Sequence, residues 1–189
     1  MTVAAILWER LDVEGHDTCR LSKLADGWRL DGRAVFREGG RPCSLSYEVT
    51  CDTGWRTRSA LVTGSLGAQD LRFEIAPSGS GGWSLNGIEQ LRLAGLIDVD
   101  LGFTPATNLL PLNRHALAVG DGTRPSPAVY LEFPEARLDY LEQTYERLGE
   151  TRYRYTSPAY GYDETLEVSD FGFVTDYPGL WQGKLWLPD

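Results

Sequence analysis

The segment Ser44-Leu-Ser-Tyr-Glu-Val-Thr-Cys51 alternates polar with apolar residues, the pattern of a β-strand that buries one face. After a short interval at 52–54, the run Trp55-Arg-Thr-Arg-Ser-Ala-Leu-Val62 again contains β-branched and aromatic residues. Because so few residues separate the two runs, we predict that they pair as antiparallel neighbours.

Two short segments on either side of this pair resemble each other. They are Gly27-Trp-Arg-Leu-Asp-Gly32 and Gly82-Trp-Ser-Leu-Asn-Gly87. Each ends in Asp-Gly or Asn-Gly, the dipeptides that favour a two-residue type I′ turn because both central residues need a positive φ. Each copy therefore predicts a hairpin.

Further strands are predicted in the C-terminal third. A looser hairpin is expected over 166–174, another over 143–155 with its turn near Gly149 and Glu150, and a strand over 128–133 that ends at Pro134. The segment 138–148 fits both a strand and a helix of about three turns, and we favour the strand.

The composition favours a mainly β fold with few short helices. The 189 residues include 21 glycines, 10 prolines and one methionine, as expected for short strands joined by tight turns. We predict one domain over 1–189, an internally duplicated and strongly curved antiparallel sheet that forms a spiral β-roll or half-barrel. The hairpin repeats would span about 17–65 and 69–120, and a C-terminal β portion about 127–189.

Charge and targeting signals limit the partners and the location. The net charge of -9 disfavours nucleic acid as a partner, and we expect no transmembrane segment, since no apolar run approaches the roughly 20 residues of a span. The N-terminus lacks the basic start of a signal peptide. Three cysteines without CxxC spacing indicate free thiols, so we expect a cytoplasmic protein.

The segment Asp98-Val-Asp-Leu-Gly-Phe-Thr-Pro-Ala-Thr-Asn-Leu-Leu-Pro111 concentrates polar groups among apolar residues. On a strand Asp98 and Asp100 share one face, and Gly102 to Pro105 should then turn the backbone out of the sheet. Such a segment either holds a buried loop or meets a ligand, and the residues alone leave both open. Arg114 is a candidate buried partner for one carboxylate, whose pKa it would then lower.

The sequence lacks the residue patterns of most catalytic and cofactor-binding sites. Two isolated histidines, no GxSxG and no metal-ligand spacing disfavour a catalytic triad and a metal site, and no phosphate-binding loop or cofactor is expected. Two carboxyls about 5 to 10 Å apart suffice for glycoside hydrolysis, so Asp98 and Asp100 keep that alternative open.

Aromatic residues offer a different chemistry. Six tryptophans and nine tyrosines provide apolar faces with hydrogen-bonding groups, as in surfaces that bind sugars and amphiphiles, although Trp28 and Trp83 are expected in the core. If 55–62 is one strand, Arg56 and Arg58 share a face and could meet Asp98 and Asp100 or an anionic ligand.

Several motifs together extend over nearly the whole chain: residues 27–32, 47–52, 55–58, 98–111, 143–145, 153–155 and 174–181. In these motifs the chain resembles a bacterial family named putative glycolipid-binding. The resemblance implies a duplicated spiral β-roll and a lipid or glycolipid ligand, and it implies no known reaction. After Leu110-Pro111 the family pattern continues with paired arginines, whereas this chain continues with Leu112-Asn113-Arg114-His115 and has only one.

We therefore predict a non-catalytic protein that binds a lipid or glycolipid in an apolar β-roll cavity with a polar mouth. The alternatives are a hydrolase of a glycoside or ester that uses Asp98 and Asp100, and a structural protein that forms a homodimer. The candidate ligand-binding residues are Asp98, Asp100, Thr104, Thr107, Asn108 and Arg114, followed by Arg56, Arg58, Tyr155 and Tyr177.

Overall fold

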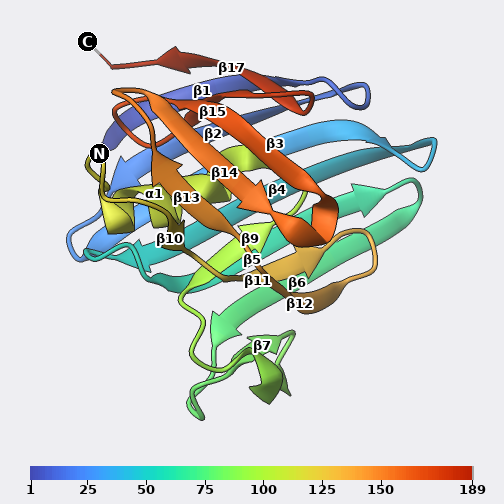
Figure 1. The fold of residues 1–189 in the computed structure, drawn as a ribbon. Coiled ribbons are helices and arrows are strands. Elements are labelled where there is room, and N and C mark those ends of the chain that lie inside the picture. Colours follow the sequence, from blue (N-terminus) through green and yellow to red (C-terminus); the bar gives the residue numbers. More distant parts are fainter. Residues whose placement is uncertain (189) are drawn as a thin grey trace.

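The computed structural model describes residues 1–188, which form a mainly β protein with two sheets and one short α-helix (Figure 1). The large sheet has 14 strands in the order β10-β13-β14-β15-β16-β17-β1-β2-β3-β4-β5-β6-β7-β8. All pairs within it are antiparallel, and β17 beside β1 joins its C-terminal and N-terminal halves. The prediction of a mainly β fold with a large antiparallel sheet is confirmed.

The strands of the N-terminal half are β1 (Thr2–Arg10), β2 (Gly15–Lys23), β3 (Gly27–Glu38), β4 (Arg41–Asp52), β5 (Thr57–Leu66), β6 (Gln69–Pro77), β7 (Trp83–Leu85) and β8 (Ile88–Gln90). Those of the C-terminal half are β10 (Arg124–Pro125), β13 (Thr144–Arg147), β14 (Arg152–Ser157), β15 (Tyr162–Val168), β16 (Val174–Tyr177) and β17 (Trp181–Trp186).

The small sheet has three strands in the order β12-β11-β9: β9 (Asp98–Leu101), β11 (Ala128–Glu132) and β12 (Arg137–Leu141). Strands β9 and β11 are parallel, and Tyr130 lies opposite Asp100. The helical elements are the 3-10 turns η1 (Leu91–Leu93), η2 (Pro105–Asn108) and η3 (Pro158–Tyr160) and the helix α1 (Leu109–His115). The strand alternative for 138–148 is confirmed over β12.

Most of the predicted hairpins are present. The runs 44–51 and 55–62 fall mainly on β4 and β5, which pair with Tyr47 opposite Val62. Asn86 and Gly87 both have positive φ at the turn from β7 to β8, as a type I′ turn requires. The hairpins predicted over 143–155 and 166–174 are β13–β14 and β15–β16.

The hairpin predicted at Asp31-Gly32 is wrong. Both residues lie inside the continuous strand β3, which pairs with β4 along its whole length. A Cβ added to Gly32 would lie 2.2 Å from Cζ of Tyr47, so the glycine makes room for a ring.

A single hydrophobic cluster contains side chains from both halves of the large sheet, from the small sheet and from α1. Trp8 on β1 is fully buried and donates a hydrogen bond from its indole N–H to the carbonyl of Val174 on β16, at 2.7 Å. Trp83 is buried, as predicted. Trp28 is only half-buried and stacks on Trp55, with ring centroids 4.6 Å apart.

Candidate ligand-binding cavity

The segment 98–111 leaves the small sheet where its sequence predicts. Strand β9 ends at Leu101, whose carbonyl accepts a hydrogen bond from the backbone N–H of Thr104 at 2.9 Å. The Thr104 hydroxyl then accepts from the N–H of Ala106 at 3.1 Å and caps η2, which begins at Pro105. The polar side chains of this segment are therefore placed by a cap and a tight turn.

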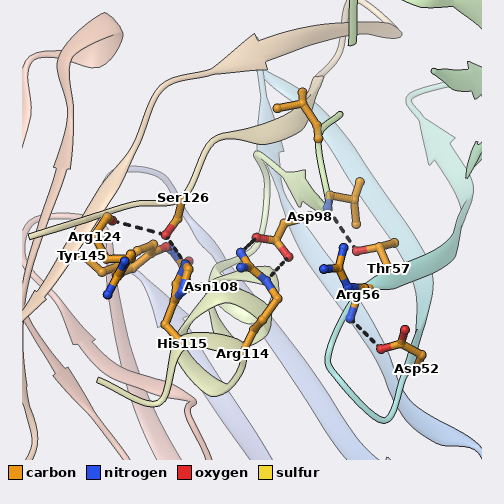
Figure 2. Close-up of polar contacts among 12 residues, drawn as sticks. Asp52, Arg56, Thr57, Asp98, Asn108, Arg114, His115, Arg124, Ser126 and Tyr145 are labelled. Atoms are coloured by element: carbon orange, nitrogen blue, oxygen red, sulfur yellow. Dashed lines mark hydrogen bonds and ion pairs between the residues drawn. The ribbon is translucent and has the colours of Figure 1, made fainter. Parts of the chain in front are cut away.

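Asp17 on β2 attaches this turn to the large sheet. Its buried carboxylate accepts hydrogen bonds from the hydroxyls of Thr104 and of Tyr47, the latter at 3.0 Å. Burial raises the pKa of Asp17 to about 7, although both hydrogen bonds lower it. At the end of η2, the side-chain amide of Asn108 donates to the hydroxyl of Tyr145 on β13 at 2.6 Å (Figure 2). The turn thus makes polar contacts with both halves of the large sheet.

Asp98 forms the buried ion pair that the sequence predicts. The guanidinium of Arg114 on α1 faces both oxygens of its carboxylate, with Nε at 3.3 Å from Oδ1 and Nη2 bonded to Oδ2 (Figure 2). The expected lowering of its pKa is wrong, because burial outweighs Arg114 and leaves the pKa raised. Because its partner Arg114 belongs to the same chain, we assign this carboxylate a structural role.

Asp100 differs from Asp98 in having no partner. Only 8% of the residue is exposed, yet among residues 1–188 no group donates a hydrogen bond to its carboxyl. Burial, together with the negative charge of Asp98, raises the pKa of Asp100 to about 7. A buried carboxyl without hydrogen bonds destabilises the folded state. The space beside it therefore shows whether a ligand could supply the missing partner.

Asp100 lines a cavity of about 320 Å³, which we call the tyrosine cavity. Five tyrosines line it, and in the C-terminal half of the large sheet their rings pack in contact: Tyr177 has its centroid 5.8 Å from that of Tyr155 and 5.0 Å from that of Tyr162. The full lining is Arg10, Asp12, Asp100, Gly102, Thr104, Pro105, Asn108, Tyr130, Leu141, Tyr155, Ser157, Tyr160, Tyr162, Tyr177, Leu180 and Trp181.

The other two charged residues of the cavity neutralise each other. Arg10 donates from Nε and Nη2 to the two carboxylate oxygens of Asp12, at 2.8 and 3.0 Å. Burial opposes ionisation of Asp12, but the hydrogen bonds and charge of Arg10 leave its pKa below the ordinary value. The guanidinium also lies over the rings of Phe36 and Trp181, and its buried Nη1 has no hydrogen-bond partner within 1–188.

Comparison with known proteins supplies the family. The sequence profile of the family described as Putative glycolipid-binding matches residues 5–183. The chain belongs to this family. It is similar to the crystal structure of a DUF1089 family protein from Pseudomonas aeruginosa, with 26% identity, a TM-score of 0.76, and 88% of this chain and 91% of that chain covered.

A β-barrel-like protein of the domain of unknown function DUF1849 from Brucella abortus has a similar fold, with 12% identity, a TM-score of 0.56 and coverage of 99% and 98%. No curated protein matches the chain.

In this member of the putative glycolipid-binding family, half of the ten candidate residues come together in the tyrosine cavity. They are Asp100, Thr104, Asn108, Tyr155 and Tyr177. Asp98 and Arg114 lie outside the lining, and so does Thr107, whose buried hydroxyl accepts from the N–H of Leu101 at 3.3 Å. Asp98 and Asp100 therefore do not line one cavity as an acid–base pair for glycoside hydrolysis would.

The arrangement predicted for the two arginines near 55–58 is present only in part, since the charge of Arg56 does act on Asp98 and lowers its pKa, against the larger effect of burial. The strand starts at Thr57, because Trp55 has φ 64°, so Arg56 is outside it. Arg58 is exposed and pairs with Asp26 at 2.6 Å instead of meeting the carboxylates of β9. Neither arginine lines the tyrosine cavity.

Sequence reasoning missed part of the cavity and the residue that anchors it: Arg10, Asp12, Asp17, Tyr130, Tyr160, Tyr162 and Trp181. They lie on strands or connections far apart in the chain, and no local spacing links them to Asp100. The number of tyrosines was the one available signal, although it gave no positions.

His115 lies beside a serine, which is the pairing that nucleophilic catalysis uses. His115 contacts the hydroxyl of Ser126 at 2.9 Å, but Ser126 is almost fully buried, and burial lowers the pKa of His115 to about 4 (Figure 2). Residues 1–188 contain no group of three or more metal-ligating side chains. In the same range, no helix has both the length and the apolar character needed to cross a bilayer.

Proposed function

We propose that the protein binds a glycolipid without catalysis and that the sugar headgroup occupies the tyrosine cavity. The observation that carries the proposal is the buried carboxyl of Asp100, which accepts no hydrogen bond from residues 1–188 and lies beside aromatic rings. Sugars are bound by such surfaces because their C–H faces pack on rings while their hydroxyls donate to carboxylates. The volume, about 320 Å³, suits a small ligand group.

The character of the lining favours the headgroup over the acyl chain. Apart from Gly102 and Pro105, its non-aromatic apolar members are Leu141 and Leu180, and the rest are polar or aromatic. We therefore place the acyl chain outside, beside the exposed Leu11, whose backbone N–H donates to the carbonyl of Leu180 at 2.9 Å. Each CH₂ removed from water there would contribute about 0.8 kcal/mol.

We also propose that the large sheet curves as a β-roll around the turn at η2. The polar contacts of Thr104 with β2 and of Asn108 with β13 support this arrangement, since one short segment meets both halves of the sheet. Curvature of this kind would hold β14 to β16 against the small sheet and keep the cavity open between them.

The first test is calorimetric titration with octyl β-D-glucoside, a minimal glycolipid, below its micelle concentration. Tyr160→Ala removes a half-exposed ring from the cavity wall, and Tyr140→Ala removes a ring of similar exposure, 53% against 57%, from outside it. We expect Tyr160→Ala to weaken binding about tenfold and Tyr140→Ala to leave it unchanged.

Equal effects of both variants, or no binding to the unmodified chain, would overturn the proposal. Product analysis belongs to the same experiment. Recovery of the intact glucoside agrees with binding without catalysis, whereas release of octanol would favour the hydrolase alternative.

A further inference from the structure

The tyrosine cavity has an unbalanced negative charge. Of its three charged residues, Arg10 and Asp12 form an ion pair with two hydrogen bonds, so their charges cancel. Among residues 1–188, Asp100 has neither a cation nor a hydrogen-bond donor as a partner, although only 8% of the residue is exposed. An anionic ligand would be repelled here, and a ligand with a positive charge would supply the missing partner.

We propose that the headgroup taken by the tyrosine cavity carries a positively charged amine, which pairs with the carboxylate of Asp100. This inference rests on the proposed function and narrows its ligand class. The chemistry is shared by an amino sugar and by a choline-type headgroup.

The aromatic lining supports a cation for a second reason. The faces of tyrosine rings attract ammonium groups, and the attraction is stronger where water is excluded. Tyr130 lies directly opposite Asp100 in the register of β9 and β11, and its ring packs on that of Tyr160 with centroids 5.6 Å apart. Aromatic rings beside one carboxylate form the cage that organic ammonium ions prefer.

The unpartnered Nη1 of Arg10 fits the same ligand. Arg10 lines the cavity, and its buried Nη1 has no hydrogen-bond partner within 1–188, so it still has N–H groups that can donate a hydrogen bond, while Asp12 already balances the charge of the guanidinium. A hydroxyl or ether oxygen of a headgroup can accept that hydrogen bond without carrying a negative charge. The cavity thus presents an acceptor for an ammonium group and a donor for a neutral oxygen.

The inference predicts how binding depends on pH. The pKa of Asp100 is raised by burial to about 7, so the carboxylate gains its charge as the pH rises through 7. Choline keeps its charge at every pH, so its affinity should rise over pH 6 to 8 and level off above. The other titratable groups near Asp100 belong to three sets. Burial keeps the tyrosines neutral: Tyr130, Tyr145, Tyr155, Tyr162 and Tyr177, beside which the exposed Tyr160 also lines the cavity. Asp98 is paired with Arg114, and Asp12 is paired with Arg10.

The test compares ligands matched except for charge. Octyl β-D-glucosaminide at pH 7 differs from octyl β-D-glucoside by an amine at C2, and choline at pH 8 differs from 3,3-dimethyl-1-butanol by the charge alone. We expect each cation to bind about tenfold more tightly than its neutral analogue. Asp100→Asn should abolish that preference and the pH dependence, whereas Asp70→Asn, the same change at an exposed site on β6, should keep both.

Each outcome decides between the two proposals. Equal affinity for the two glycosides with no response to choline overturns the amine and leaves the glycolipid proposal standing. Selective binding of choline without either glycoside supports the amine and overturns the sugar. Absence of binding by all four probes overturns both.

Discussion

Asp100 should make the stability of this protein depend on pH in a way that a single substitution removes. In the unfolded chain its carboxyl titrates near 3.8, and in the fold burial raises its pKa to about 7. Between these values the folded state keeps a proton that the unfolded state has lost. The contribution of Asp100 to the free energy of unfolding therefore falls as the pH rises from about 4 to 7 and stays at the lower level above 7.

The size of the effect follows from the two pKa values. One carboxyl changes the free energy of unfolding by about 1.4 kcal/mol for each pH unit in that window. From pH 5 to pH 8, only the part up to about 7 counts, so Asp100 contributes a loss of about 3 kcal/mol. The amide in Asp100→Asn does not titrate, so the variant does not have this loss. The free energy of unfolding of the variant minus that of the unmodified protein should therefore be about 3 kcal/mol more positive at pH 8 than at pH 5.

The assay is urea unfolding followed by tryptophan fluorescence at both pH values. Asp17 also has a pKa raised to about 7, but it is present in both proteins and cancels from the difference. Asp70→Asn is the control and should show the same small difference at each pH. A stability difference between Asp100→Asn and the unmodified protein that is equal at pH 5 and pH 8 would refute the reasoning.

Three further substitutions test the surroundings of the cavity by the same unfolding assay. Arg114→Met should lose about 3 to 5 kcal/mol at pH 8, because it leaves the carboxylate of Asp98 buried without its cation, and a second change of Asp98→Leu should restore much of the loss. Gly102→Ala should lower the free energy of unfolding by about 1 to 3 kcal/mol and weaken glycoside binding, because the new Cβ would lie 2.2 Å from Oη of Tyr130. An unchanged urea midpoint would contradict that contact. Asn86→Ala should lose about 1 to 2 kcal/mol, because a side chain that bonds the backbone of β6 is removed at a positive φ; Asn86→Gly, which tolerates that φ, should lose less.

The strands could be predicted wherever residues close in sequence determine them, through alternation of polar and apolar residues or through a turn. The pairing of β4 with β5 and the turn at Asn86-Gly87 depend on residues close in sequence. The same dipeptide logic failed at Asp31-Gly32 for a reason that lies outside the local sequence. There, Asp31 is part of a strand and pairs with Arg20, while Gly32 leaves space for Tyr47 from the neighbouring strand.

The candidate site was predictable only along one segment. The spacing of Asp98 and Asp100 placed both on β9, and Arg114 lay near enough in sequence to be proposed as a partner. The contact of Thr104 with Asp17 joins residues 87 positions apart, and the tyrosines of the cavity come from both sheets and the turn η3. These contacts depend on how the sheets pack, which alternation does not encode.

The three buried carboxyls around the segment 98–111 show which of them the fold requires. Asp17 accepts hydrogen bonds from Thr104 and Tyr47, and Asp98 has the guanidinium of Arg114, so each has its partners within the chain. Asp100 has none within the described residues, and of the three it is the one that lines the tyrosine cavity. Its ionised form costs stability above pH 7 and gains nothing from its neighbours, whereas a cationic ligand would recover that cost as binding free energy. For this reason the ligand, more than the fold, accounts for a carboxylate at this position.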